Sequence, residues 1–257
     1  MSQTSGKPLI LITNDDGFEA KGLQTLTSML AGMADLFVVA PDKPRSAQAK
    51  AITVETPLRV RLLEERPGLT RYRCSGTPVD CAKIGFYSLV PRKPDLLLSG
   101  INHGSNSSAN TIYSGTVGAA LEGCSEDIPA IAFSLDSHDP DADFAPCGDT
   151  VRRMVERALR GGLPCGVVLN VNFPVAASFK GVRVVRQCRG RWAERFVKRT
   201  DPAGRDYYWL TGEYVNYEPD STDTDEWAVR NGYVSIVPCH ADLTRYDSIE
   251  PLSDWNE

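Results

Sequence analysis

The chain has 257 residues, of which 42% are hydrophobic and 24% are charged, a composition that excludes disordered and fibrous proteins. Its 28 basic and 33 acidic residues give a formal net charge of −5, which argues against binding nucleic acid or a membrane surface. No apolar run reaches the roughly 20 residues that span a bilayer, and the polar N-terminus predicts no signal peptide. Seven scattered cysteines without a C-x-x-C pair suit free thiols, so we expect a cytoplasmic protein.

Strands and helices alternate through the first 172 residues. Continuous apolar runs predict strands buried on both faces of a sheet, at 9–12, 36–40, 96–98, 131–133 and 167–171. Apolar spacing and capping residues predict intervening helices, at 20–30, from Thr77 onwards, at 114–123 and at 149–160. This order predicts an α/β fold with a doubly wound, mostly parallel, Rossmann-like sheet.

The character of the chain changes after Pro174. Residues 180–215 carry nine basic and four acidic side chains, and a turn sequence at 201–205 predicts a β-hairpin. A hairpin that exposes this many aromatic residues would be unstable alone in water, so it either folds back on the core or packs on another subunit. A helix at 225–230 and a strand at 233–237 follow. We expect residues 1–257 to form a single domain with this hairpin as an appended arm.

Three polar clusters each follow a predicted strand, at 14–17, at 42–46 and at 99–104. The carboxyl ends of parallel strands share one edge of the sheet, so these clusters should be neighbours in space. The adjacent carboxylates of Asp15 and Asp16 suit Mg²⁺, Mn²⁺ or Ca²⁺, and Gly17 permits the turn that would let both face one ion. Alternatively, one aspartate caps the next helix and the other is solvated.

A second candidate site is the start of the helix at 114–123. Its Ser-Gly-Thr sequence offers free backbone N–H groups and two hydroxyls to an anion, although a plain helix cap would look the same. Next to a metal ion, a phosphate cradle indicates phosphoryl chemistry. The motifs of dinucleotide-binding Rossmann proteins, P-loop NTPases and α/β-hydrolases are absent from the sequence.

The histidines and the acidic tract give weaker signals. His103 is either a phosphate donor or general acid, or a supporting residue beside Asn102. The tract 136–143 reads as a solvated surface loop, because neither a helix nor a strand end orders it. His240 is expected at the surface, and the basic face of the hairpin is expected to be solvated.

Several longer stretches spread over about residues 9–245 carry recognisable motifs. They are ILITNDDGFEAKGLQTL, APDKPRSA, CSGTPVDCAKIG, LLLSGINHGSN, YSGTVGAALEG, NVNFP and GYVSIVPCHADLT. Together these stretches resemble the survival protein SurE family of nucleotidases. The resemblance implies a divalent-metal-dependent enzyme that hydrolyses nucleoside 5′-monophosphates, and in some members 3′-monophosphates or short polyphosphate.

The resemblance also assigns site residues. It places one divalent ion per subunit, Mg²⁺ or Mn²⁺ with Ca²⁺ as a substitute in crystals, on Asp15, Asp16, Ser46 and Asn102. It places the substrate phosphate on Asn102, Ser114, Gly115 and Thr116. Ser46 is usually followed by glycine in this family, and Ala47 stands here instead. The residues around 190–232 resemble the family's exchange arm, which implies a homodimer or a homotetramer.

The implied mechanism assigns catalysis to Asp15 and Asp16, which hold the ion or accept a proton from a water acidified by it. Asn102 and the 114–116 loop would steady the phosphoryl oxygens. An aspartyl-phosphate route stays open, since a carboxylate at this position can be a nucleophile. Two other classes compete with a nucleotidase: a phosphoacceptor switch module, which the chain length disfavours, and a non-catalytic, metal-gated nucleotide sensor.

Overall fold

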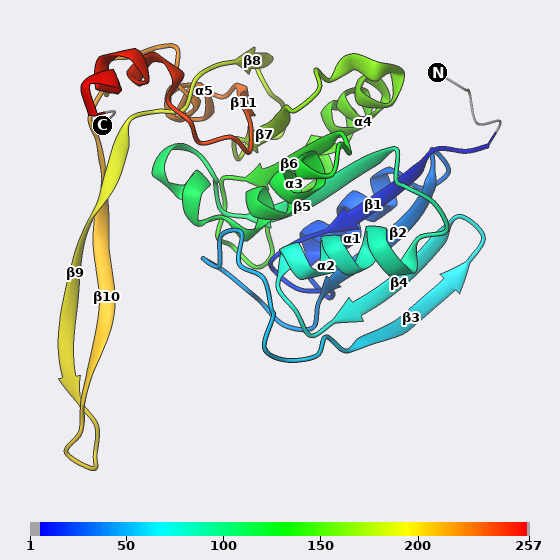
Figure 1. The fold of residues 1–257 in the computed structure, drawn as a ribbon, viewed down its shortest axis with the longest axis horizontal. Coiled ribbons are helices and arrows are strands. Elements are labelled where there is room, and N and C mark those ends of the chain that lie inside the picture. Colours follow the sequence, from blue (N-terminus) through cyan, green and yellow to red (C-terminus); the bar gives the residue numbers. More distant parts are fainter. Residues whose placement is uncertain (1–5, 256–257) are drawn as a thin grey trace.

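The computed structural model describes residues 6–255, which build an α/β fold around one nine-stranded sheet (Figure 1). The order across the sheet is β3-β4-β2-β1-β5-β6-β7-β11-β8. Its strands are β1 (Leu9–Thr13), β2 (Asp35–Pro41), β3 (Val60–Arg66), β4 (Leu69–Cys74), β5 (Leu96–His103), β6 (Ala130–Leu135), β7 (Val168–Phe173), β8 (Val182–Val184) and β11 (Val234–Cys239). All neighbours pair in parallel except β3 with β4 and β7 with β11. The predicted mostly parallel sheet is confirmed.

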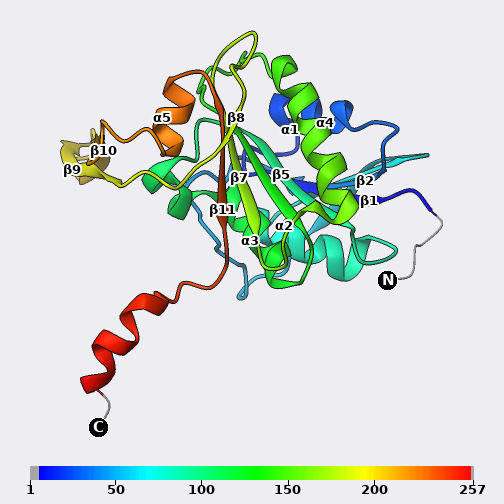
Figure 2. The ribbon, with the colours of Figure 1, turned by 90° about the horizontal axis from the view of Figure 1, so that it is seen from above.

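Helices cover both faces of this sheet. They are α1 (Lys21–Met29), α2 (Pro78–Ile84), α3 (Gly115–Ser125), α4 (Gly148–Arg157) and α5 (Asp225–Arg230). In Figure 2, α1 and α4 lie on one side of the sheet, and α2 and α3 lie on the other. Strand β1 serves both layers, because Ile10 and Ile12 belong to the cluster under α1 and α4, whereas Leu11 belongs to the cluster under α2 and α3. The winding on both faces is therefore also confirmed.

Local sequence signals account for the helix boundaries. At the start of α2, the Thr77 hydroxyl accepts from the Asp80 N–H (3.1 Å) while the Asp80 carboxylate accepts from the Thr77 N–H (2.9 Å), as the sequence predicts. Helix α4 ends at Arg157, before the predicted 160, and passes into a π-helical turn, Ala158–Gly162. Gly161 has φ +80°, which suits glycine and ends the helical conformation.

Strands β3 and β4 have no counterpart in the sequence prediction. They form a hairpin at the edge of the sheet, and β3 exposes most of its side chains. An edge strand of this kind lacks the continuous apolar run that marks the buried strands. Short 3-10 and π-helical segments connect the remaining elements, at Gly85–Leu89, Ser108–Tyr113, Ala145–Cys147, Tyr246–Ser248 and Glu250–Trp255.

The hairpin is present and longer than the sequence predicts. Its strands β9 (Gly190–Thr200) and β10 (Asp206–Asn216) form a separate two-stranded sheet that projects away from the body (Figure 1). Phe196, Tyr208 and Trp209 are between 59% and 69% exposed, so the hairpin does not fold back on its own core. Among the described residues, the arm is bonded to the body at its base, where Trp192 Nε1 donates to Asn110 Oδ1 (2.8 Å). We refer to residues 190–216 as the arm.

Two expectations from composition concern membranes and disulfides. Within residues 6–255, no helix combines the length and the apolarity needed to cross a bilayer. All seven cysteines lie in the described part of the chain and are free thiols, as predicted.

Candidate metal and phosphate site

The carboxyl edge of the sheet brings the three polar clusters together, as expected for the ends of parallel strands. The N–H of Arg45, after β2, donates to the carbonyl of Asp15, after β1 (2.7 Å). The N–H of His103, at the end of β5, donates to Asp16 Oδ2 (3.1 Å). Gly17 has φ +101°, so the chain does turn directly after the acidic pair.

Asp15 is held at the N-terminus of α3. Its side chain is 5% exposed, and Oδ1 accepts a hydrogen bond from the Thr116 hydroxyl (2.5 Å). A Cβ on Gly115 would lie 3.0 Å from both Cβ and Oδ2 of Asp15, so a larger residue here would have to displace this carboxylate. Burial raises the pKa of Asp15 to about 6, against the effect of the Thr116 hydrogen bond and with a further contribution from the charge of Asp16.

Asp16 faces the end of β5 instead. Burial raises the pKa of its carboxyl as well, while the hydrogen bond from the His103 N–H and the charges of His103 and His138 oppose that rise. The two adjacent carboxylates therefore contact different elements and are both destabilised as anions. A divalent cation would relieve this destabilisation, which favours the metal hypothesis over a plain helix cap.

Asn102 presents its amide oxygen to the same edge. Its Nδ2 donates to the carbonyls of His103 (3.2 Å) and Gly104 (2.8 Å), so Oδ1 is the atom left for another ligand. The register of β5 against β6 shifts between Ser99 and Asn102, and this irregularity sets the direction of the strand end.

Ser46 lies on the surface of the loop after β2. It directly follows Arg45, whose N–H is bonded to Asp15, so the main chain carries Ser46 to the acidic pair. Ala47 has φ +58°, a left-handed conformation that favours glycine, and this accounts for the glycine usually found after Ser46 in the family that the sequence resembles. The assignment of Ser46 as a ligand stays a prediction.

The predicted phosphate loop coincides with the first turn of α3. The Ser114 Oγ caps the helix by accepting from the Val117 N–H (3.0 Å), and its own hydrogen stays available for donation. Thr116 is fully buried, and its hydroxyl is bound to Asp15 rather than directed at an open anion site. Backbone N–H groups of the first turn are therefore the main donors that an anion would meet here.

The candidate metal ligands are two carboxylates, one amide oxygen and one hydroxyl. Within residues 6–255, no group of three or more His, Cys, Asp and Glu side chains could hold an ion. Mg²⁺ is commonly bound by one or two carboxylates together with water and substrate phosphate, and two carboxylates with neutral oxygens nearby fit that pattern. The residues present therefore fit a magnesium- or manganese-type site and not a zinc site.

The tract 136–143 is a surface loop with mostly exposed residues, as predicted, but the expectation that no strand end orders it is wrong. The tract directly follows β6, whose Leu135 pairs with His103, and so starts at the same edge of the sheet. The carbonyl of Asp139 lies 3.1 Å from His103 Nδ1, and Phe144, just beyond the tract, is buried in the core. The signal in the sequence was partial, because the acidic residues begin three positions after the end of the predicted strand 131–133.

A buried polar network behind the site was also missed. The loop after β5 is fixed where the Asn106 N–H donates to Asn172 Oδ1 (2.7 Å) and Asn106 Nδ2 donates to Ser134 Oγ (2.8 Å). Asn170 Nδ2 donates to the Asn106 carbonyl (2.9 Å). Two asparagines alternating with apolar residues in the buried strand β7 were the available signal.

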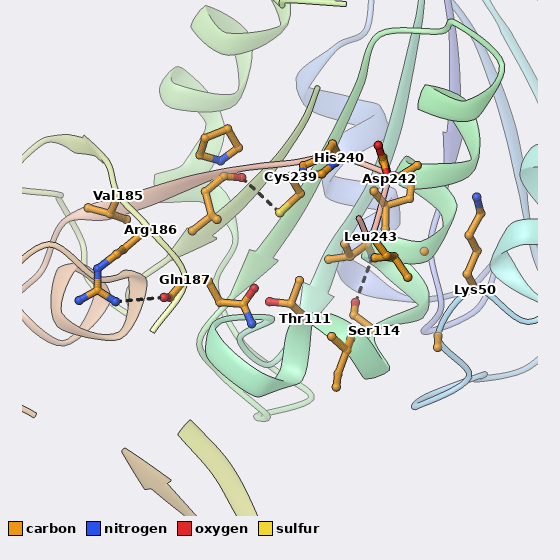
Figure 3. Close-up of a pocket in the computed structure, with 18 of the residues that line it drawn as sticks. Lys50, Thr111, Ser114, Val185, Arg186, Gln187, Cys239, His240, Asp242 and Leu243 are labelled. Atoms are coloured by element: carbon orange, nitrogen blue, oxygen red, sulfur yellow. Dashed lines mark hydrogen bonds between the residues drawn. The ribbon is translucent and has the colours of Figure 1, made fainter. Parts of the chain in front are cut away.

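A cavity of about 960 Å³ adjoins the phosphate loop (Figure 3). It lies between α3, residues 184–187 and the segment 237–245, and Ser114 lines it. Neither of the two aspartates nor Asn102 lines this cavity, so it is separate from the carboxylate edge. His240 is exposed, as predicted, and also lines this cavity.

Comparisons with known proteins agree with this fold and identify the family. A family model described as "Survival protein SurE" matches residues 10–194. The 5′-nucleotidase SurE of Phocaeicola vulgatus is 49% identical over 250 residues, covering 97% of each chain, and that of Flavobacterium johnsoniae is 50% identical over 252 residues, also covering 97% of each. The crystal structure of the SurE protein from Aquifex aeolicus matches with a TM-score of 0.83 and 36% identity, covering 97% of this chain and all of that one. The chain belongs to the SurE family.

Proposed function

We propose that this chain is a divalent-metal-dependent phosphomonoesterase that hydrolyses nucleoside 5′-monophosphates to nucleoside and phosphate. Family membership and the name 5′-nucleotidase of its relatives support the activity. The observation that carries the proposal for the site is the hydrogen bond from Thr116 to Asp15. This contact joins the acidic pair and the start of α3, so a cation and a phosphate would be held side by side.

Four side chains would hold the ion: Asp15, Asp16, Asn102 and Ser46. When bound, Mg²⁺ or Mn²⁺ supplies polarisation of a phosphoryl oxygen and acidifies a nearby water. Thr116 orients the buried Asp15 carboxylate as a ligand, and the more exposed Asp16 is placed to accept a proton. The first turn of α3 and the Ser114 hydroxyl hold the phosphoryl oxygens, with the positive end of the helix dipole behind them.

Attack by water is favoured over attack by Asp15. The Asp15 carboxylate is 5% exposed, bound to Thr116 and packed against Gly115, which leaves little approach to phosphorus. Hydrolysis of a chiral thiophosphate ester in isotopically labelled water separates the two routes. Direct attack by water inverts the configuration at phosphorus, whereas an aspartyl-phosphate route retains it.

Phosphate release from AMP and GMP tests the activity. We expect release with Mg²⁺ or Mn²⁺, loss of release with a chelator, and at least about a hundredfold lower turnover in Asp16→Asn at saturating metal. Asp220→Asn, at an exposed position, is the matched control. Nucleotide binding without phosphate release under any of these metals would identify a sensor instead and overturn the proposal.

Hydrolysis rates on a panel of phosphate substrates test which of them the protein prefers. We propose 5′-monophosphates as the main substrates, with 3′-monophosphates and tripolyphosphate hydrolysed more slowly, as the resemblance implies. The panel is run with each metal, and a faster rate with 3′-AMP than with 5′-AMP would contradict this order.

We also propose that the arm joins subunits into a homodimer or a homotetramer. Its exposed aromatic side chains need a covering surface, and none is supplied by the body within residues 6–255. Phe196→Ser should lower the molar mass measured by light scattering, whereas Val54→Ser, also exposed, should not. A wild-type protein that elutes as a monomer would contradict the assembly.

The free thiols support a reducing, cytoplasmic location.

A further inference from the structure

The loop after β6, residues 136–144, forms a wall beside the proposed metal site. It is tied down at several points: the Ser137 N–H donates to the Leu135 carbonyl (2.7 Å), and Lys21 Nζ donates to the Asp141 carbonyl (2.8 Å). Phe144 anchors its end in the core. A loop fixed in this way can present a side chain to the site in a defined position.

The side chain that it presents is His138. A Cβ built on Gly104 would lie 2.3 Å from His138 Cε1 and 2.8 Å from Nδ1, so the imidazole rests directly on the Gly104 backbone. The carbonyl of Gly104 accepts from Asn102 Nδ2, which places the ring one backbone contact away from a proposed ligand.

The two histidines at this edge, His103 and His138, differ in whether their ring nitrogens already have a hydrogen-bond partner. His103 Nδ1 lies 3.1 Å from the Asp139 carbonyl, and its ring packs edge-to-face on Phe144 with centroids 4.9 Å apart. His103 is therefore committed to holding the wall in place. His138 is exposed, and its ring nitrogens make no hydrogen bond within the described residues, so an N–H remains for a ligand.

We infer that His138 donates a hydrogen bond to the phosphoryl group of the bound substrate, which makes it a further substrate-binding residue of this site. The inference rests on the proposed function. A phosphate monoester brings more oxygen acceptors than the first turn of α3 and one ion can satisfy, and an imidazole beside Gly104 supplies an additional donor.

His138→Phe is the variant that tests this role, because it keeps a ring on Gly104 and removes both ring nitrogens. Inorganic phosphate is titrated calorimetrically into the Mn²⁺-saturated protein, and the Mn²⁺ affinity is measured separately by electron paramagnetic resonance. We expect phosphate to bind roughly ten- to a hundredfold more weakly, with a higher KM for AMP and an unchanged Mn²⁺ affinity. His138→Gln, which retains an N–H donor, should recover part of the loss.

Tyr87→Phe is the control, since Tyr87 is exposed and lies outside both the proposed site and the cavity beside Ser114. Equal phosphate affinity in the two phenylalanine variants overturns the inference. Parallel loss of Mn²⁺ affinity and phosphate affinity in His138→Phe also overturns it, because it would assign His138 to holding the loop. A wild-type protein that hydrolyses no nucleotide refutes the proposed function, whereas the phosphate titration still decides the role of His138.

Discussion

Replacing Asp15 by asparagine should make the metal-free protein more stable while it removes activity. Burial raises the pKa of Asp15 from its ordinary value of 3.8 to about 6, because the folded protein disfavours the charged carboxylate. That difference corresponds to about 3 kcal/mol at roughly 1.36 kcal/mol per pH unit. Asparagine keeps an acceptor for Thr116 and carries no charge, so it removes this penalty.

The pH dependence follows from the direction of the shift. A raised pKa means that protonation favours the folded state, so the contribution of Asp15 to stability is fully present below pH 3.8 and is lost as the pH rises through about 6. The advantage of Asp15→Asn should therefore be small near pH 4 and reach about 3 kcal/mol at pH 7. For a protein of this size, that is a rise of roughly 6–12 °C in Tm.

Thermal and urea unfolding in the presence of a chelator, from pH 4 to pH 8, measure this difference. Asp220→Asn, an exposed substitution, is the control. Added Mn²⁺ should raise the Tm of the wild type and not that of Asp15→Asn, because a bound ion stabilises only the form that holds it. Equal stability of wild type and variant at pH 7, or an advantage independent of pH, would refute the reasoning.

Three further substitutions test other parts of the site. Gly115→Ala places a Cβ 3.0 Å from Asp15 Oδ2 and should weaken Mn²⁺ binding at least about tenfold by paramagnetic resonance; unchanged affinity would contradict the close packing. Glu122→Gln leaves two lysines without their carboxylate and should lower the free energy of unfolding in urea by about 1–2 kcal/mol. Against the effect of burial, Lys83 and Lys50 hold the pKa of Glu122 below its ordinary value of 4.5, so this loss should be complete above pH 4.5 and vanish as the pH falls through the lowered pKa. Ala47→Gly should stabilise the protein by up to about 1 kcal/mol, since relief of the left-handed conformation exceeds the entropy cost of glycine; destabilisation in urea would contradict this.

The central strands and their carboxyl ends were predictable, because burial on both faces leaves a continuous apolar run in the sequence. That pattern located the acidic pair, the loop after β2 and the end of β5 at one edge. The hairpin of β3 and β4 was not predictable in the same way, since the edge strand β3 is largely exposed and carries several charged residues.

Individual side-chain roles were harder to predict than the position of the site. The Thr116 hydroxyl was expected to face an anion, but it is bound to Asp15, a partner 101 positions away. Such a contact depends on how closely α3 approaches β1, which no local pattern encodes. His138 was passed over because the strand before it was predicted to end earlier than Leu135, which hid its position at the edge.

The base of the arm is bound to the segment that leads into the phosphate loop. Trp192 Nε1 donates to Asn110 and the Tyr214 hydroxyl donates to Ser108, and the 3-10 helix that contains both acceptors ends at Tyr113, directly before Ser114. A neighbouring subunit bound to the arm would therefore act on the backbone segment that leads into the proposed phosphate loop. If the arm joins subunits as proposed, we expect a substitution at its root to change subunit assembly and turnover together.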